Sequence, residues 1–283
     1  MGFLVGILTG FSASVQNTLV KKMPRVDTAA LNGFRFGCTA LVLAILVSIF
    51  ASWNIPPLPF FFILLVSIPL ELVVSFCYIK ALQLSPQSLV GPLFSLSVIF
   101  LIPISFVVFG EAPSLVGWIG IIAGFLGSLL LGWDIKEPDV RKSLLAIFEE
   151  KGTHYMLIAA LAAALTVTLA KFSFQYANPL VTGFYVLGGL SLAYLPSALK
   201  EIPPIFRTHW KNLIGLGLSN IAVNSLHFVG LSLMPSAYFI SLKRSSILFD
   251  VFLGRFVHQE THFKERLAGS ALMLTAIVLI LLA

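Results

Sequence analysis

Residues 58–82 read LPFFFILLVSIPLELVVSFCYIKAL, and only Glu71 and Lys80 in this stretch are charged. A helix crosses the roughly 30 Å hydrocarbon core of a bilayer with about 20 apolar residues. A helix at the surface of a soluble protein would instead show a polar face along its length, and this stretch has no such face. It therefore predicts a membrane-spanning helix with Glu71 near its middle.

Apolar stretches of this kind recur along the whole chain. The 283 residues are 58% hydrophobic and 11% charged, with a mean hydropathy of +0.98, whereas a soluble domain carries about 25% charged residues. Turn-forming residues separate the stretches, including Ile202-Pro203-Pro204 between the seventh and the eighth. The sequence predicts an all-α membrane protein with ten spans at about 2–20, 28–50, 58–82, 87–109, 114–133, 154–176, 180–199, 211–233, 236–257 and 264–283.

The two halves of the chain are related by a shift of 149 residues without a gap. Each half contains five predicted spans, and an odd number places the second copy in the membrane with the opposite orientation, as an inverted repeat. We predict a first five-helix repeat over 1–133, a cytoplasmic linker over 134–153 and a second repeat over 154–283. The shift aligns Pro86 with Pro235, Glu111 with Glu260, Gly120 with Gly269, Lys22 with Lys171, Leu82 with Leu231 and Phe100 with Phe249.

Basic residues are concentrated in the loops that follow the odd-numbered spans. Cytoplasmic loops of membrane proteins carry an excess of Lys and Arg, so these loops are expected in the cytoplasm and both termini outside it. We predict a multi-pass protein of the cell membrane, of the bacterial inner-membrane type. The loop cations are Lys21, Lys22, Arg25, Lys136, Arg141, Lys142, Lys151, Lys200, Arg207, Lys211, Arg255, Lys264 and Arg266.

A motif occurs once in each half. Residues 81–86 read ALQLSP, a span then ends in Phe109-Gly110-Glu111, and Gly120 follows; residues 230–235 read GLSLMP, with Glu260 and Gly269 after them. This pattern resembles the EamA-type domain of the drug/metabolite transporter superfamily. The resemblance implies ten helices in two inverted repeats and transport of small metabolites. Glu111 and Glu260 lie at predicted helix ends, where we expect them to cap or orient the next helix.

Two polar stripes lie within the predicted spans. Glu71, Ser75 and Tyr78 follow i, i+4, i+7 spacing, which places them on one helical face. Two interpretations stay open, because such side chains either line a hydrophilic cavity or join neighbouring helices by hydrogen bonds. The shift of 149 residues maps the first stripe onto Asn220, Asn224 and His227.

Lys243 and Arg244 lie inside a predicted span, where charged groups usually face a cavity or a partner. Adjacent residues of a helix project about 100° apart, so both reach one point only if the helix is distorted. Either Asp250 and Glu71 neutralise Lys243 and Arg244, or the two cations hold an anionic group. The pair is similar to the Lys-Arg pair of plastid triose-phosphate translocators, which implies contact with a substrate phosphate.

Together these features predict a secondary transporter that moves a small polar, anionic metabolite by alternating access. Glu71 and Asp250 are the candidates for proton coupling. The alternatives are an amino-acid or drug-like exporter of the same fold, or a non-transporting membrane scaffold. The predicted substrate-binding residues are Lys243, Arg244, Glu71, Tyr78, Asn220, Asn224, His227, Ser241 and Asn17.

Other function classes lack a supporting pattern. The sequence has no nucleophile elbow, no His-Glu-x-x-His and no Gly-rich phosphate loop, so we predict no enzyme, no cofactor and no metal. The basic loops are short and lack interleaved aromatics, which argues against nucleic-acid binding. The expected partners are the solute and the lipid bilayer, with the protein acting as a monomer or homodimer.

Overall fold

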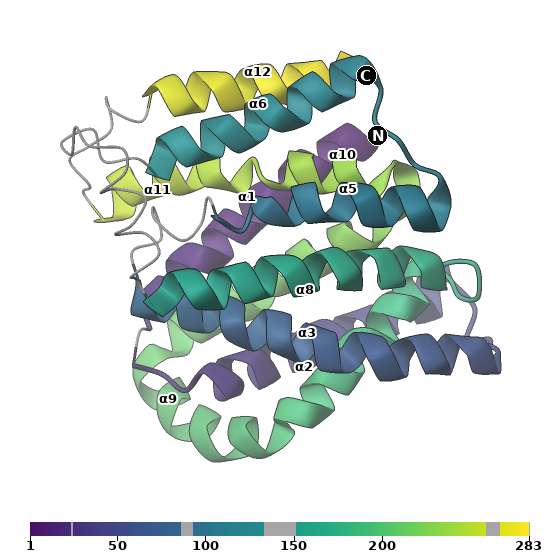
Figure 1. The fold of residues 1–283 in the computed structure, drawn as a ribbon. Coiled ribbons are helices and arrows are strands. Elements are labelled where there is room, and N and C mark those ends of the chain that lie inside the picture. The colour runs from purple at the N-terminus through teal and green to yellow at the C-terminus, as the bar shows by residue number, and fades with distance from the viewer. Residues whose placement is uncertain (24, 86–92, 133–150, 259–266, 283) are drawn as a thin grey trace.

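A computed structural model describes residues 1–23, 25–85, 93–132, 151–258 and 267–282. Every regular element in these ranges is a helix, which confirms the all-α prediction. The labels follow Figure 1. The helices are α1 Gly2–Lys21, α2 Thr28–Phe50, α3 Leu58–Leu84, α5 Leu96–Phe109, α6 Leu115–Gly132, α8 Lys151–Ser173, α9 Pro179–Leu233, α10 Ser236–Lys243, α11 Ser246–His258 and α12 Leu267–Leu282.

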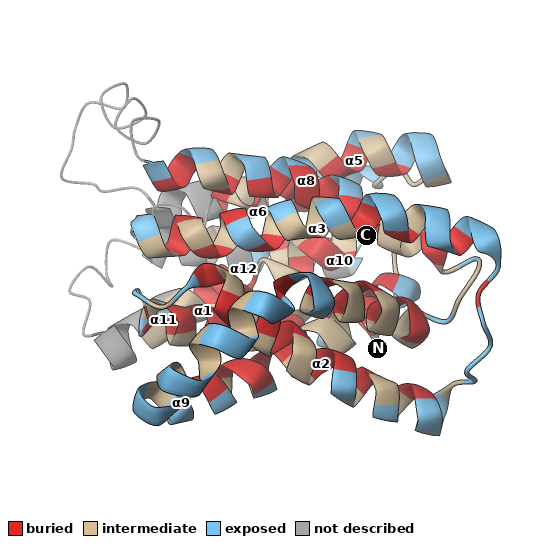
Figure 2. Ribbon diagram, turned by 90° about the horizontal axis from the view of Figure 1, so that it is seen from below, coloured by how far each residue is buried: buried red, intermediate tan, exposed pale blue. Residues whose placement is uncertain are grey.

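Five of these helices (α1, α2, α3, α8 and α9) are long and apolar enough to cross a membrane. Their outward sides carry large apolar residues such as Leu41 and Leu65, whose exposed fractions are 71% and 70%. Figure 2 shows exposed residues on the outer sides of the bundle and buried ones turned inward. Hydrocarbon around the bundle removes the cost of this exposed apolar surface, because lipid tails are as apolar as the side chains.

Local chemistry defines several helix ends. Asp27 accepts a hydrogen bond from the amide of Ala30 (2.7 Å) and caps α2, and Asn178 caps α9 through the amide of Leu180 (2.9 Å). Both satisfy amides that the helix itself leaves unpaired. At the end of α5, Gly110 adopts φ 68°, the left-handed conformation that glycine takes without strain. A short loop leads from that turn to α6.

The prediction of a loop at Ile202-Pro203-Pro204 was wrong. These residues are helical, and α9 continues from Pro179 to Leu233 with its one non-helical residue at His209 (φ −125°, ψ 24°). A proline inside a helix lacks the amide for one hydrogen bond and its ring bends the helix, so Pro203 and Pro204 curve α9 without ending it. The predicted spans 180–199 and 211–233 are thus joined through a helical bend, which Figure 1 shows at its lower left.

The predicted span 236–257 is two helices, α10 and α11, separated by a turn at Arg244-Ser245. A matching turn at Phe94-Ser95 precedes α5, in the predicted span 87–109, whose residues 87–92 lie outside the described ranges. In both turns the chain uses bonds between residues three apart, from Ser97 to Phe94 (3.1 Å) and from Ile247 to Arg244 (3.0 Å). The shift of 149 residues places Ser95 on Arg244, so the two breaks are equivalent.

The main helix contacts repeat across the two halves. Helix α3 packs on α8 as α1 packs on α9, and α5 packs on α8 as α1 packs on α11. The remaining large contacts, α2 with α9 and α6 with α12, join elements that the shift exchanges. Both termini lie at the same end of the bundle (Figure 1). The predicted linker lies outside the described residues up to residue 150, and residues 151–153 already belong to α8.

Helix α1 approaches the break between α10 and α11 very closely at Gly10. A Cβ atom there would overlap Ser245 Oγ and would lie 3.0 Å from both the Lys243 carbonyl oxygen and the Ser246 amide nitrogen. Two of these three atoms belong to backbone, which cannot rotate away. The glycine therefore permits the contact between α1 and the helix break.

We expect Gly10→Ala to destabilise the protein by about 1–3 kcal/mol, the cost of overpacking a close contact. Gly188→Ala is the matched control, because a Cβ at Gly188 meets nothing within 4 Å and Ala is the better helix former. Thermal unfolding of the purified variants measures the difference. An unchanged melting temperature for Gly10→Ala would contradict the close contact.

Candidate functional site

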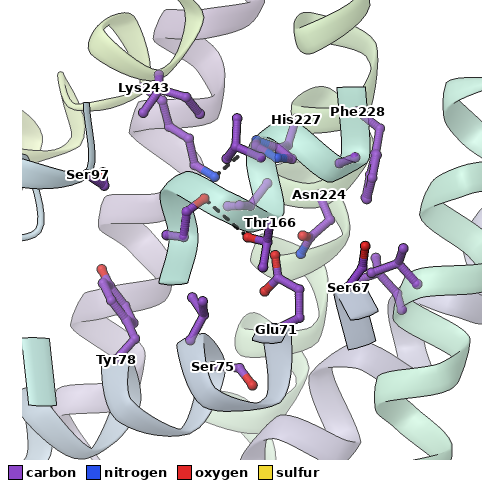
Figure 3. Close-up of a pocket in the computed structure, with 18 of the residues that line it drawn as sticks. Ser67, Glu71, Ser75, Tyr78, Ser97, Thr166, Asn224, His227, Phe228 and Lys243 are labelled. Atoms are coloured by element: carbon purple, nitrogen blue, oxygen red, sulfur yellow. Dashed lines mark hydrogen bonds between the residues drawn. The ribbon is translucent and has the colours of Figure 1, made fainter. Parts of the chain in front are cut away.

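A cavity of about 160 Å³ lies between the two halves of the helical bundle. Its wall is formed by α1, α2, α3, α8, α9 and the two helix breaks, and Figure 3 shows the side chains that point into it. Most of the predicted site residues meet here, although they come from distant parts of the chain. The polar side chains of the wall are Gln16, Asn17, Arg35, Ser67, Glu71, Ser75, Tyr78, Ser97, Thr166, Ser173, Thr182, Asn220, Asn224, His227, Lys243, Arg244 and Ser246.

The stripe on α3 lines one side of the cavity. The Glu71 carboxyl group points toward Thr166 and Asn224 (Figure 3). Ser75 lies 3.0 Å from the hydroxyl of Tyr194, and the Tyr78 hydroxyl donates to Asn17 Oδ1 (2.9 Å). The three residues share the cavity-facing side of the helix, as their spacing predicts.

The stripe on α9 both joins neighbouring helices and lines the cavity. Asn220 Nδ2 donates to the carbonyl oxygen of Arg35 (3.0 Å) and to Thr39 Oγ1 (2.7 Å), so it holds α9 against α2. One turn later Asn224 Nδ2 donates to the Asn220 carbonyl oxygen (3.0 Å). The His227 ring lies at the cavity with Nδ1 3.3 Å from Lys243 Nζ. Asn220 therefore joins helices, while Asn224 and His227 face the cavity.

Lys243 and Arg244 lie at the break between α10 and α11, which supplies the distortion that two adjacent cations need to reach one cavity. Arg244 Nη2 donates to Ser97 Oγ (2.6 Å), and its guanidinium carbon lies 4.2 Å from the centre of the Phe94 ring. Since Phe94 and Ser97 belong to the other break, this contact brings both breaks together. Lys243 contacts His227 and Arg244 contacts Ser97, in place of the pairings with Asp250 and Glu71.

Two predicted site residues lie outside the cavity wall. Asp250 accepts from Ser14 Oγ (2.5 Å) and from Asn17 Nδ2 (3.4 Å), so it joins α11 to α1. Ser241 lines a separate void of about 20 Å³ next to Arg244. Neither side chain contributes directly to the larger cavity.

Arg35 on α2 is a cavity residue that the sequence reasoning missed. Its side chain is only 5% exposed and lines the cavity, with the guanidinium carbon 4.5 Å from the ring centre of Phe36. Within the described ranges the guanidinium has no ion pair, and its Nε has no hydrogen-bond partner. The sequence did contain an indication of this role, because a charged residue well inside the predicted span 28–50 by itself suggests a functional site.

Glu111 and Lys171 form an ion pair between the two halves at the end of the bundle that carries the termini. Lys171 also donates to the carbonyl oxygen of Met234 (3.1 Å), and Glu111 Oε2 accepts from the amide of Ser236 (3.2 Å). The motif glutamate therefore caps α10 of the other half, and not the next helix in sequence as predicted. The ion pair ties α5, α8 and α10 together.

The chain contains two related sets of apolar helices, and together they enclose one buried polar cavity. This is the architecture of a multi-pass membrane transporter. Residues 1–133 and 150–282 each match the model of the EamA-like transporter family. The chain belongs to this family, whose members are transporters of the drug/metabolite superfamily, as the resemblance implied.

The fold also occurs among solved structures. The chain is similar to a protein of known crystal structure over 100% of its own length and 99% of that chain, with a TM-score of 0.75 and 16% sequence identity. No curated protein matches the sequence significantly. Among the described residues, no group of three or more His, Cys, Asp or Glu side chains is placed to hold a metal ion.

Proposed function

We propose that the protein is a secondary transporter that moves a small anionic metabolite across the membrane by alternating access. The balance of charge around the cavity is the observation that supports this most. Three cations, Arg35, Lys243 and Arg244, and one carboxylate, Glu71, line the cavity, which gives a formal excess of +3 − 1 = +2. Charges in a membrane interior need compensation, and a bound anion supplies it.

The size of the cavity favours a small solute over a drug-like one. Its volume of about 160 Å³ is close to the roughly 150 Å³ of a cavity that accepts benzene. Pockets for drug-sized ligands enclose about 300–1,000 Å³. A metabolite of a few carbon atoms with an acidic group fits both the volume and the charge.

The repeated architecture supports ten spans in two inverted halves. The shift of 149 residues exchanges the large helix contacts with one another, as a two-fold axis through the cavity requires. Discontinuous helices at the interface of two repeats are the usual place of a transporter's binding site, and both breaks reach this cavity. Rocking of the halves about the cavity then exposes it to each side in turn.

An amino-acid exporter is the second candidate, favoured by Glu71. This carboxylate faces the cavity and has no ion pair within the described ranges, so an ammonium group has a partner there. The same position makes Glu71 a better proton carrier than Asp250, which is bound by Ser14 and Asn17.

Arg244→Gln should abolish uptake of the substrate, because a glutamine cannot form the forked, charge-assisted bonds of a guanidinium. Purified protein in liposomes is exposed to an isotope-labelled extract of small metabolites, and mass spectrometry identifies what accumulates inside. We expect small anions to accumulate with the unaltered protein and to be lost in the variant.

Lys211→Gln is the matched control, since it removes one exposed positive charge next to Trp210 and far from the cavity wall. Its uptake should equal that of the unaltered protein. Accumulation of zwitterionic amino acids would favour the second candidate. Uptake of anions that survives Arg244→Gln would overturn the proposed role of this residue.

Glu111→Gln should open the end of the bundle that carries the termini. The neutral amide weakens the tie to Lys171, and a weaker tie shifts the population toward conformers in which that end is open. The measurement is the labelling of Ser67→Cys at the cavity wall by a membrane-impermeant maleimide, with Cys38 and Cys77 replaced by Ala. We expect labelling severalfold faster than with Glu111 present.

Glu201→Gln serves as the control for this experiment. It breaks the exposed ion pair with Lys200 (3.3 Å), and exposed ion pairs contribute little to stability. Its labelling rate should not change. Equal rates for Glu111→Gln and Glu201→Gln would refute the proposal that the ion pair of Glu111 and Lys171 holds this end closed.

Both termini are proposed to lie outside the cytoplasm. Lys21, Lys200 and Arg207 lie near the ends of α1 and of the first part of α9, opposite the termini in Figure 1, and cytoplasmic loops carry such cations. Fusion of a reporter that is active only in the cytoplasm to Ala283 should give no signal, and a reporter inserted after Lys22 should give one. Strong signal from the first fusion contradicts this orientation.

A further inference from the structure

We propose that Arg35 is a second anion-binding position, and that the transported solute carries two separate acidic groups. The inference rests on the proposed function, because it concerns the same cavity. It adds a residue on α2 to the cations at the break between α10 and α11. One acidic group of the solute is held by Lys243 and Arg244, and the other by Arg35.

The surroundings of Arg35 point to a missing partner. The residue is only 5% exposed, yet within the described ranges it forms no ion pair and its Nε has no hydrogen-bond partner. The Phe36 ring centre lies 4.5 Å from its guanidinium carbon. A guanidinium carries five donors and keeps its charge at physiological pH. Its forked geometry matches a carboxylate or a phosphate.

The position of Arg35 is fixed by its own backbone. Its carbonyl oxygen accepts hydrogen bonds from Asn220 Nδ2 (3.0 Å) and from Thr39 Oγ1 (2.8 Å). These bonds anchor this turn of α2 to α9, and burial beside the Phe36 ring restricts the side chain. A pre-positioned cation of this kind binds an anion with little loss of conformational freedom.

The cations occupy different elements of the cavity wall. Arg35 comes from α2, whereas Lys243 and Arg244 come from the break after α10. Glu71 and Tyr78 of α3 lie within electrostatic reach of both groups. A single carboxylate therefore offsets only part of the charge, and the formal excess of two positive charges matches a solute with two negative ones.

Matched pairs of small acids test the proposal by thermal stabilisation of the purified protein. Succinate is compared with butyrate, glutarate with valerate, and phosphoglycolate with ethyl phosphate, because each pair differs by one acidic group. We expect at least one diacid to bind roughly 30-fold more tightly than its partner, the effect of one charge-assisted contact. Equal affinity within all three pairs overturns the second position without requiring any variant.

Variants then assign the two positions. Arg35→Gln should reduce the affinity for the diacid to that of its monoacid partner and leave the monoacid unchanged, whereas Arg244→Gln should weaken both. Lys211→Gln should weaken neither. If Arg35→Gln does not fold, Arg35→Lys replaces it. Lysine keeps a charge at the site, so this variant should retain part of the preference for the diacid over the monoacid.

The outcomes separate this inference from the proposed function. A preference for diacids that survives Arg35→Gln overturns the role of Arg35, while the loss of both acids in Arg244→Gln would still support an anionic substrate. Absence of stabilisation by every acid in the panel overturns the anionic substrate, and with it the second position.

Discussion

The hydrocarbon interior of a bilayer offers no hydrogen bonds to the backbone, and the architecture of this protein depends on that constraint. Helices satisfy it because every amide pairs within its own segment, which explains why the described elements are all helical. Irregular backbone at membrane depth is tolerated only where it lines a cavity or is covered by protein. The turns at Phe94-Ser95 and Arg244-Ser245 meet this condition, since Phe94 and Arg244 both line the cavity.

The two breaks also explain how one cavity is built from two halves. Arg244 of the second half donates to Ser97 of the first and packs on Phe94, so the contact spans the repeat interface. Gly10 lets α1 approach the same break from the other side. The ion pair of Glu111 and Lys171 joins the halves again at one end. At the opposite end Ser197 Oγ donates to Asp27 Oδ1 (3.0 Å) and the Gly152 amide donates to Ser85 Oγ (3.3 Å), so the halves are joined there as well.

Much of the fold could be predicted from the sequence, because apolar length and turn residues determine where a helix crosses a membrane. Repeat spacing also grouped Glu71, Tyr78, Asn224 and His227, which all line one cavity. The helical bend at 202–209 was missed, since a pair of prolines usually ends a helix, whereas Pro203 and Pro204 lie inside one. Arg35 was missed because it has no charged counterpart in the other half of the chain. Asp250 bonds to α1 and Ser241 lines a separate void, because the break between α10 and α11 interrupts the regular helical spacing on which their grouping with the cations rested.

The charge balance of the cavity bears on coupling as well as on substrate choice. A cavity with excess positive charge is costly to carry through the membrane centre when it is empty, because unpaired charge in a low-dielectric interior is strongly disfavoured. On the proposed function, a bound anion removes that cost, so the loaded protein would reorient more readily than the empty one. This favours exchange of one anion for another. Net movement in one direction would need a second way to reduce the charge, because Glu71, the carboxylate of the cavity wall, is already counted in the excess of two positive charges.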